Sequence, residues 1–248
     1  MKNRKSRWVI FWGVLCLYCL TAIAQPQSGK LKIYCIDVDQ GSSTLIITPN
    51  GKSILIDCGD DVKADSVYNV ITNLAKLLEI NYFVCTHYHD DHYGSLDKLA
   101  NKGLAVTDKF YNRNSQDWLD DHRTETDDFL EYASISEGKR EYLRPGKTIS
   151  IDDEVSIECF VANGRAKGEY GSIDYPAEEN GYSLGLIISY NGFDFLIAGD
   201  ITEDVEQKLV SRGILRDIDL YHVSHHAAET SSCQAFLDSI KPEVCIVS

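Results

Sequence analysis

The chain has 248 residues, of which 44% are hydrophobic and 25% are charged. That length and composition fit one large domain, or two modest ones, with a full hydrophobic core. The formal net charge of −14 counts against a general DNA-binding or membrane-surface protein, because a strongly acidic protein repels polyanions at long range.

The first 24 residues have the pattern of a secretory signal peptide. Four basic residues precede the apolar stretch 8–20, and Ala22-Ile23-Ala24 follows as a small-x-small cleavage site. The apolar stretch is shorter than the roughly 20 residues of a membrane-spanning helix, which disfavours an anchor. We therefore expect cleavage after residue 24, a folded domain over residues 25–248, and a periplasmic or secreted protein without membrane contact.

Removal of this segment makes the chain more acidic and leaves six cysteines. Four of the 24 basic residues and none of the 38 acidic residues would leave, which takes the net charge from −14 to −18. An exported protein with an even number of cysteines can form disulfides. Most of the six lie in apolar strand-like runs, so small buried side chains are an equally good interpretation.

The first half of the domain is predicted to run hairpin, helix, strand. Asn50-Gly51 marks a hairpin turn between two strands, and apolar residues at helical spacing follow from residue 62. Residues 108–146 are less regular, and we interpret them as an insertion that could cover the site, with a helix over 124–135. The expected strands are 31–38, 44–48, 52–57 and 81–85, and the expected helices are 62–78 and 95–100.

The second half is predicted to repeat the same order after a loop over 163–180. The expected strands are 148–151, 155–161, 182–190, 193–198, 219–223 and 243–247, and the expected helices are 202–211 and 231–240. The repeated order suggests two similar αβ halves that each deliver ligands at strand ends. Sheets faced by helices predict a layered α/β sandwich.

The densest chemistry lies in the stretch THYHDDH at residues 86–92, directly after a predicted strand. Side chains two apart in an extended segment point the same way, so His87 and His89 can bind one metal ion together. Asp91 and His92 lie beyond that pair and can face a second ion. Imidazole with carboxylate suits zinc, and suits manganese or iron as oxygen ligands increase. The sequence therefore predicts two divalent metal ions as cofactors.

Two aspartates at the ends of other strands can complete this site. Asp200 ends the run FLIAGD and is placed to share its carboxylate between the two ions. Asp57 is better placed to orient a ligand histidine from behind. Two ions about 3.5–4 Å apart can ionise a shared water and clamp both oxygens of a displacement reaction.

The pattern His-x-His-x-Asp-His at 87–92, after ILIDCG at 54–59, resembles the metallo-β-lactamase fold superfamily. Three more stretches narrow the resemblance to the hydrolase domain of ComEC/Rec2-type DNA-uptake competence proteins. They are ENGYSL at 179–184, FLIAGD at 195–200, and VSHH with TSS between 223 and 232. The resemblance covers most of the chain from residue 31 to residue 248. Such relatives continue past the last strand, so we interpret the chain as a fragment or as a shortened member whose domain is incomplete at the C-terminus.

The resemblance implies a four-layer αβ/βα sandwich with the metals at its edge. His87 and His89 would serve the first metal, Asp91, His92 and His225 the second, and Asp200 would bridge them. His226 would act near the substrate, and Asp91 would also orient or accept a proton during catalysis. The sequence departs from the family where Asn180 replaces a histidine ligand, which makes it a weak ligand, and where Ala227-Ala228 replaces Gly-Ser.

The leading functional hypothesis is an exported metal-dependent hydrolase of a phosphodiester or a related anion. One alternative is a lactone, thioester or β-lactam hydrolase, and another is a degenerate member that only binds metal. The substrate is expected to be a small molecule or short oligonucleotide, without a stable nucleic-acid complex; the oligomeric state stays open. A short oligonucleotide would require a local basic rim, for which the candidates are Lys139, Arg140, Arg144, Lys147, Arg165 and Lys167.

Overall fold

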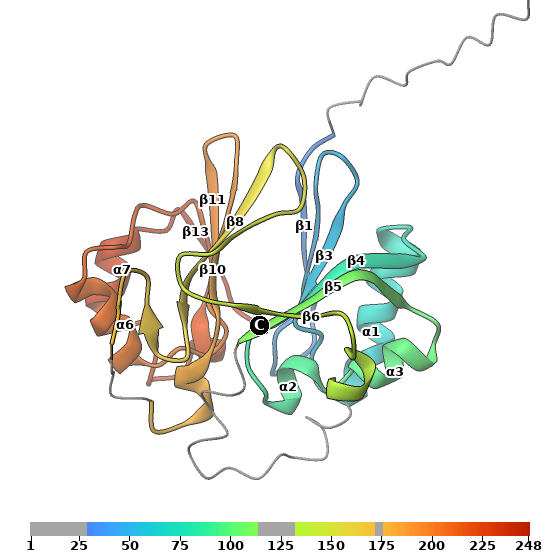
Figure 1. Ribbon diagram of the computed structural model, residues 1–248, viewed down its shortest axis with the longest axis horizontal. Coiled ribbons are helices and arrows are strands. Elements are labelled where there is room, and N and C mark those ends of the chain that lie inside the picture. The colour runs from blue at the N-terminus through green and yellow to red at the C-terminus, as the bar shows by residue number, and fades with distance from the viewer. Residues whose placement is uncertain (1–28, 114–131, 172–175) are drawn as a thin grey trace, which may run out of the picture.

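The computed structural model describes residues 29–113, 132–171 and 176–248. Two mixed β-sheets pack face to face, with helices on both outer sides (Figure 1). This arrangement confirms the predicted four-layer αβ/βα sandwich. The signal-peptide prediction for residues 1–24 lies outside the described residues. Within the described ranges, no helix combines the length and the apolar character that a membrane span requires.

The N-terminal sheet contains six strands in the order in which they follow along the chain. Its first three strands are antiparallel, and the pairs from β3 onward are parallel. The carboxyl ends of β3, β4 and β5 therefore meet at one edge. The strands are β1 (Lys32–Cys35), β2 (Thr44–Ile47), β3 (Ser53–Ile56), β4 (Glu79–Cys85), β5 (Ala105–Arg113) and β6 (Arg140–Leu143).

The C-terminal sheet has the order β13-β12-β11-β10-β8-β7, and the short β9 pairs with β8. It also changes from antiparallel pairs to parallel pairs, at β11. The two halves are thus built alike, as the repeated order of elements predicts. The strands are β7 (Thr148–Ser150), β8 (Val155–Ala162), β9 (Arg165–Ala166), β10 (Gly185–Tyr190), β11 (Phe193–Ile197), β12 (Leu220–His222) and β13 (Val244–Ile246).

The helices are shorter than the apolar periodicity predicts. The helix expected at 62–78 is divided into a 3₁₀ turn, an α-helix and a π-helical turn, and the backbone becomes left-handed at Lys76 (φ +62°). The helical elements are η1 (Asp61–Lys63), α1 (Ala64–Asn69), η2 (Val70–Leu74), α2 (Asp90–Tyr93), α3 (Leu96–Asn101), η3 (Glu179–Tyr182), α6 (Glu203–Ser211), η4 (Ser224–Ala227) and α7 (Gln234–Ile240).

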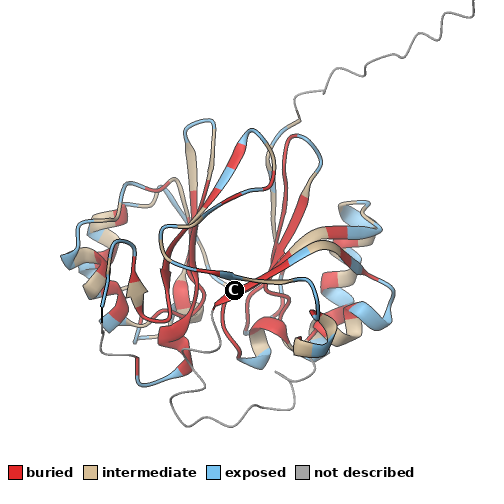
Figure 2. Cartoon of the chain, in the orientation of Figure 1, coloured by how far each residue is buried: buried red, intermediate tan, exposed pale blue. Residues whose placement is uncertain are grey.

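Three apolar clusters fill the spaces between the four layers. Successive residues of β3 alternate between them: Leu55 packs toward α1 and α3, while Ile54 and Ile56 face the other sheet. On the far side, Leu196 and Tyr221 of the C-terminal sheet pack against α6 and α7. Figure 2 shows that burial is concentrated along the two sheets. This core holds the two sheet edges in a constant relation to each other.

Three of the six cysteines in the described part of the chain belong to the core. All six cysteines in the described part of the chain are free thiols, and Cys58, Cys85 and Cys159 are buried. Burial raises the pKa of the Cys58 and Cys85 thiols well above the usual range. The interpretation as small buried side chains therefore holds for these three cysteines, whereas Cys35 and Cys233 are half-buried and Cys245 is exposed.

The prediction that residues 108–146 form an irregular insertion is wrong at both ends. Strand β5 runs through Arg113, and β6 adds a parallel sixth strand to the same sheet. Strand β5 was not predicted because polar residues such as Asp108 interrupt its apolar pattern. In the structure, Asp108 is paired with Lys52 across the sheet. The helix expected at 124–135 lies mostly outside the described residues.

The loop expected at 163–180 contains the short strand β9. The strand expected from residue 182 begins later, at Gly185 of β10, because η3 occupies residues 179–182.

Truncation of Leu186 measures how far the fold depends on the core between the sheets. Leu186 is fully buried there, so Leu186→Ala should lower the free energy of unfolding by about 2–5 kcal/mol. Leu78→Ala is the matched control, since Leu78 is 87% exposed and its loss should change stability by no more than about 0.5 kcal/mol. Urea unfolding of both variants provides the comparison, and equal effects would contradict this description of the core.

Candidate metal centre

The predicted ligands come together where the carboxyl ends of parallel strands from both sheets meet. Asp57 follows β3 and the histidine stretch 87–92 follows β4, while Asp200 follows β11 and His225-His226 follows β12. Ligand sites of α/β sheets commonly lie beyond these strand ends. Each half of the sandwich therefore contributes to one site.

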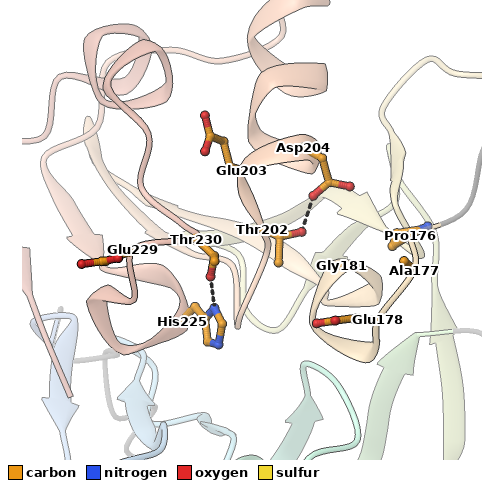
Figure 3. Close-up of a pocket in the computed structure, with 10 residues that line it drawn as sticks. All are labelled: Pro176, Ala177, Glu178, Gly181, Thr202, Glu203, Asp204, His225, Glu229 and Thr230. Carbon is orange, nitrogen blue, oxygen red and sulfur yellow. Dashed lines mark hydrogen bonds between the residues drawn. The ribbon is translucent and has the colours of Figure 1, made fainter.

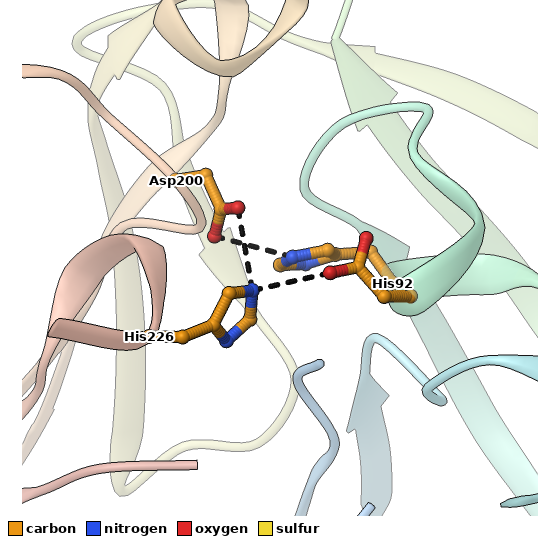
Figure 4. A group of neighbouring side chains, drawn as sticks. His92, Asp200 and His226 are labelled. Carbon is orange, nitrogen blue, oxygen red and sulfur yellow. Dashed lines mark ion pairs between the residues drawn. The ribbon is translucent and has the colours of Figure 1, made fainter. Parts of the chain in front are cut away.

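Four side chains form a compact group of candidate metal ligands: Asp91, His92, Asp200 and His226. One ligand atom from each lies within 4.8 Å of all the others. Nε2 of His92 is 3.1 Å from Oδ1 of Asp200, and Nε2 of His226 is 3.3 Å from Oδ2 of Asp91 and 3.4 Å from Oδ2 of Asp200. Figure 4 shows His92, Asp200 and His226 pointing toward one another.

The ring nitrogens in this group fit a divalent cation. Nε2 of His92 and Nε2 of His226 are buried and face carboxylate oxygens at 3.1 to 3.4 Å, but without the alignment of a hydrogen bond, a costly state for a polar atom. The opposite nitrogen of each ring is held, because Nδ1 of His92 lies 2.7 Å from Asp57 and Nδ1 of His226 lies 3.1 Å from the backbone oxygen of Ser248. This arrangement turns the Nε2 lone pairs inward, as in metal-binding histidines.

His87 and His89 lie beside this group. Nε2 of His87 is 3.1 Å from Nδ1 of His89 and 3.9 Å from Oδ2 of Asp200. Asp200 therefore faces His92 with one oxygen and both His87 and His226 with the other. That is the position in which one carboxylate can serve two ions.

His225 and Asn180 form a separate contact at the cleft. Nδ2 of Asn180 lies 3.0 Å from Nε2 of His225, and Oγ1 of Thr230 lies 3.1 Å from its Nδ1, a contact drawn in Figure 3. His225, expected from the sequence among the ligands of the second ion, thus lies outside the group of four. His226, expected near the substrate, is the histidine that joins it.

The conformation of the turn explains this exchange. His225, His226 and Ala227 all have left-handed backbone, with φ of +50°, +52° and +63°. With this left-handed backbone inside η4, the second of the two histidines faces Asp200. A left-handed conformation is unfavourable for residues with a Cβ, so the surrounding structure must hold this turn in place.

Asp57 has the position expected for a residue that orients a ligand histidine. Its carboxylate is fully buried and contacts His92; it also accepts hydrogen bonds from the backbone N–H of Thr86 at 2.8 Å and from the Thr86 hydroxyl at 2.7 Å. The role of Thr86 was missed in the sequence, although its place directly before His87 was a signal. Thr86 also limits residue 199 to glycine, since a Cβ there would lie 2.8 Å from its hydroxyl oxygen at φ +51°.

The charges of the group are strongly coupled. Burial alone would lower the pKa of His92, but the carboxylates of Asp200 and Asp57 raise it well above its ordinary value. Burial likewise opposes protonation of His226, yet its contacts with Asp200 and Asp91 raise the pKa to about 9. Burial, reinforced by the charge on His92, lowers the pKa of His87 well below its ordinary value. Without metal, the protein therefore stores positive charge on the two histidines nearest Asp200.

The site opens into a cleft of about 650 Å³ with an acidic rim. Asp39, Asp60 and Asp90 line it together with site residues, and Lys63, which is paired with Asp39, is the one lysine or arginine among the described lining residues. A second pocket, of about 390 Å³, lies on the other side of His225 and is also acidic (Figure 3). Its carboxylates are Glu178, Glu203, Asp204 and Glu229.

The basic rim expected for an oligonucleotide does not border this cleft in the described part of the chain. Arg144 and Arg165 instead line a different pocket of about 460 Å³. Lys147 is paired with Glu141, and Lys167 with Glu158. Two of the six basic side chains that the sequence suggested for substrate binding are thus neutralised by carboxylates on the surface.

Comparison with known proteins agrees with this geometry. Residues 36–155 match the family model of the metallo-beta-lactamase superfamily. Among solved structures, the metallo-beta-lactamase GOB-18 from Elizabethkingia meningoseptica superposes with a TM-score of 0.54 at 17% identity, covering 87% of each chain. A metallo-beta-lactamase from Cronobacter sakazakii superposes with a TM-score of 0.51 at 15% identity, covering 76% of each. Residues 36–155 therefore resemble the metallo-beta-lactamase superfamily in sequence, and the described part of the chain has the fold of these solved structures.

The chain is also similar to competence proteins. It is 22% identical over 268 residues to ComE operon protein 3 of Bacillus subtilis, covering 100% of this chain and 32% of that protein. It is 26% identical over 248 residues to competence protein ComA of Neisseria gonorrhoeae, covering 96% and 30%. The resemblance recognised in the sequence is confirmed, and the chain spans about a third of the length of these relatives.

The metal-free protein should lose stability as the pH rises from about 6.5 to 9. The pKa of His226 is raised on folding, so its contribution is complete below the unfolded pKa near 6.5 and disappears as the pH passes 9. Urea unfolding of chelator-treated protein at both pH values measures this change, and His226→Gln should reduce it. A saturating divalent ion should reverse the trend, because metal binding displaces the protons. Stability that rises with pH in the metal-free protein would contradict this charge state.

Ala227→Gly should stabilise the protein. Ala227 is exposed and left-handed, so glycine relieves backbone strain while losing few contacts; we expect a gain of up to about 1 kcal/mol. The neighbouring Ala228→Gly is the control, because Ala228 is extended (φ −60°) and glycine there should cost about 0.4–1 kcal/mol. The two melting temperatures should move in opposite directions, and a shift in the same direction would rule out strain at Ala227.

Proposed function

We propose that this protein is a metal-dependent hydrolase that cleaves a small phosphodiester or a related anion with water activated by two divalent ions. The observation that carries the proposal is the convergence of the buried Nε2 atoms of His92 and His226 with the carboxylates of Asp91 and Asp200. Zinc suits this mixture of imidazole and carboxylate ligands, with manganese or iron as alternatives.

The residues divide into two ligand sets that share Asp200. Asp91, His92, Asp200 and His226 would hold one ion. His87, His89 and Asp200 would hold the other, with the unpartnered Oδ1 of Asn180 as a weak additional ligand. Divalent ions supply Lewis acidity, which lowers the pKa of water and stabilises developing negative charge.

Asp91 is the residue best suited to handle the proton of the attacking water. It lines the cleft, and although burial opposes its ionisation, the contact with His226 lowers its pKa and keeps it a carboxylate. An ionised carboxylate within reach of water can accept a proton.

The choice of substrate class rests on two further observations. Similarity to proteins named for competence and recombination favours a phosphodiester. The acidic rim at Asp39, Asp60 and Asp90 disfavours a long polyanion, because like charges at a cleft mouth repel the ligand. A small phosphodiester is consistent with both observations. Its hydrolysis should depend little on salt concentration, because a small substrate makes few phosphate contacts that release counterions.

Asp91→Asn should reduce phosphodiesterase activity about 100-fold or more while leaving the fold intact, because it removes the proton acceptor. Hydrolysis of bis-(p-nitrophenyl) phosphate, a short single-stranded oligonucleotide, a lactone and a β-lactam should be measured together with bound metal. Asp217→Asn, an exposed carboxylate paired with Lys241, is the control and should retain activity.

Each result discriminates among the functions considered. Full phosphodiesterase activity in Asp91→Asn contradicts the proposed role of Asp91. Hydrolysis of the lactone or β-lactam alone supports the alternative hydrolase. Protein that contains almost no metal when purified without chelator supports a binding module.

We also propose that residues 1–24 direct export and are then removed. The support is the basic, apolar and small-x-small pattern of that segment. Amino-terminal sequencing of the protein recovered from the periplasm or medium should begin at Gln25, and an intact Met1 terminus would contradict this proposal.

A further inference from the structure

A buried ion pair joins the two halves of the sandwich close to the candidate metal centre. Arg113 is the last residue of β5, and Glu179 is the first residue of η3. Nη2 of Arg113 lies 2.6 Å from each carboxylate oxygen of Glu179. The two side chains are 0% and 4% exposed, so the pair is almost completely removed from water.

Such a pair needs an explanation other than stability. Removing two charges from water is costly, and apolar residues of similar size often serve a fold equally well. The surroundings of Arg113 are nevertheless built to hold it. Nη1 donates to Oδ1 of Asn163 at 3.2 Å, and the guanidinium lies 4.5 Å from the ring centre of Tyr88 and 5.1 Å from that of Tyr182.

The carboxylate of Glu179 reaches the backbone between two candidate metal ligands. The N–H of Tyr88, the residue between His87 and His89, donates to Oε1 of Glu179 at 2.9 Å. On the other side of His87, the N–H of Leu184 donates to the carbonyl oxygen of Thr86 at 2.9 Å. Both chain neighbours of His87 are thus bonded to the segment 179–184 of the opposite half.

The same segment carries Asn180, the residue after Glu179. Asn180 lines the cleft and is nine-tenths buried, with an oxygen that has no hydrogen-bond partner. One carboxylate therefore sets the distance between the His87-His89 backbone and the amide of Asn180. Within the group of four, the rings of His92 and His226 are held by other residues, Asp57 and Ser248, whereas Asp200 donates its N–H to Ser183 of this same segment.

We propose that Arg113 and Glu179 are a positioning pair that sets the geometry of His87, His89 and Asn180 and so controls the affinity for one of the two metal ions. Glu179 acts through the N–H of Tyr88, and Arg113 acts by fixing Glu179. This inference rests on the proposed function, since it requires two separate ions.

The test compares two double variants that both remove the buried charges. Arg113→Met/Glu179→Gln keeps a side-chain oxygen that can accept the Tyr88 N–H, whereas Arg113→Met/Glu179→Met lacks that oxygen. Single variants are avoided, because each would leave one charge buried and unpaired. Cobalt(II) titration followed by visible absorption and calorimetry measures each ion, and His89→Gln and His226→Gln assign the absorption bands to the two ligand sets.

The Arg113→Met/Glu179→Gln variant (Met/Gln) should bind both ions with nearly wild-type affinity. The Arg113→Met/Glu179→Met variant (Met/Met) should bind the ion of the set that contains His226 as the wild type does. It should bind the ion of the set that contains His89 about 10–100-fold more weakly, which is the usual effect of losing a hydrogen bond that supports the ligands of a metal ion. In the metal-free Met/Met protein, the Tyr88 amide should also exchange its hydrogen faster with solvent, a readout that is independent of metal and activity.

Two results would overturn the inference while leaving the proposed function intact. One is wild-type affinity for both ions in the Met/Met protein. The other is an equal loss of both ions, which would mean general destabilisation. Wild-type protein that binds fewer than two ions would instead overturn the two-ion function and this inference with it. Failure to cleave phosphodiesters alone would leave the positioning pair standing.

Discussion

The buried carboxylate of Asp57 is the interaction on which the rest of the site depends. An ionised carboxylate without solvent is expensive unless every oxygen is hydrogen-bonded, and Thr86 and His92 supply those bonds. The contact joins the end of β3 to the end of β4 and to the short helix that begins at Asp90. Once His92 is held by Nδ1, its Nε2 can face only Asp200, so this bond decides where the second half of the molecule must deliver its ligands.

The two candidate metal sets are supported by two different systems. Asp57 and Ser248 hold the rings of His92 and His226, whereas Glu179 holds the backbone beside His87 and His89. One system acts on side chains and the other on main chain. The two candidate sets are therefore held by different kinds of contact.

Strain is concentrated in the turn that carries His225 and His226. Three residues with a Cβ occupy left-handed backbone in sequence, and the third, Ala227, stands where the resembled family has glycine. Backbone hydrogen bonds hold this turn: the N–H of His225 donates to the carbonyl oxygen of Gly199 at 3.3 Å, and the N–H of Ala228 donates to that of His225 at 2.8 Å. A turn held in this way presents His226 to Asp200 and leaves His225 with Asn180.

The sequence by itself determined the layered fold, the two similar halves and most of the candidate ligands. Hydrophobic period and turn residues are local, and three histidines and two aspartates in six residues need no tertiary information to be noticed. The sequence could not show that β5 is a strand, because its polar residues hide the pattern, and with β5 it missed Arg113. Only the tertiary structure decided which of two adjacent histidines joins Asp200, since that choice depends on backbone angles in η4. It alone also paired Arg113 with Glu179, because the two residues lie 66 positions apart and meet only when the sheets pack.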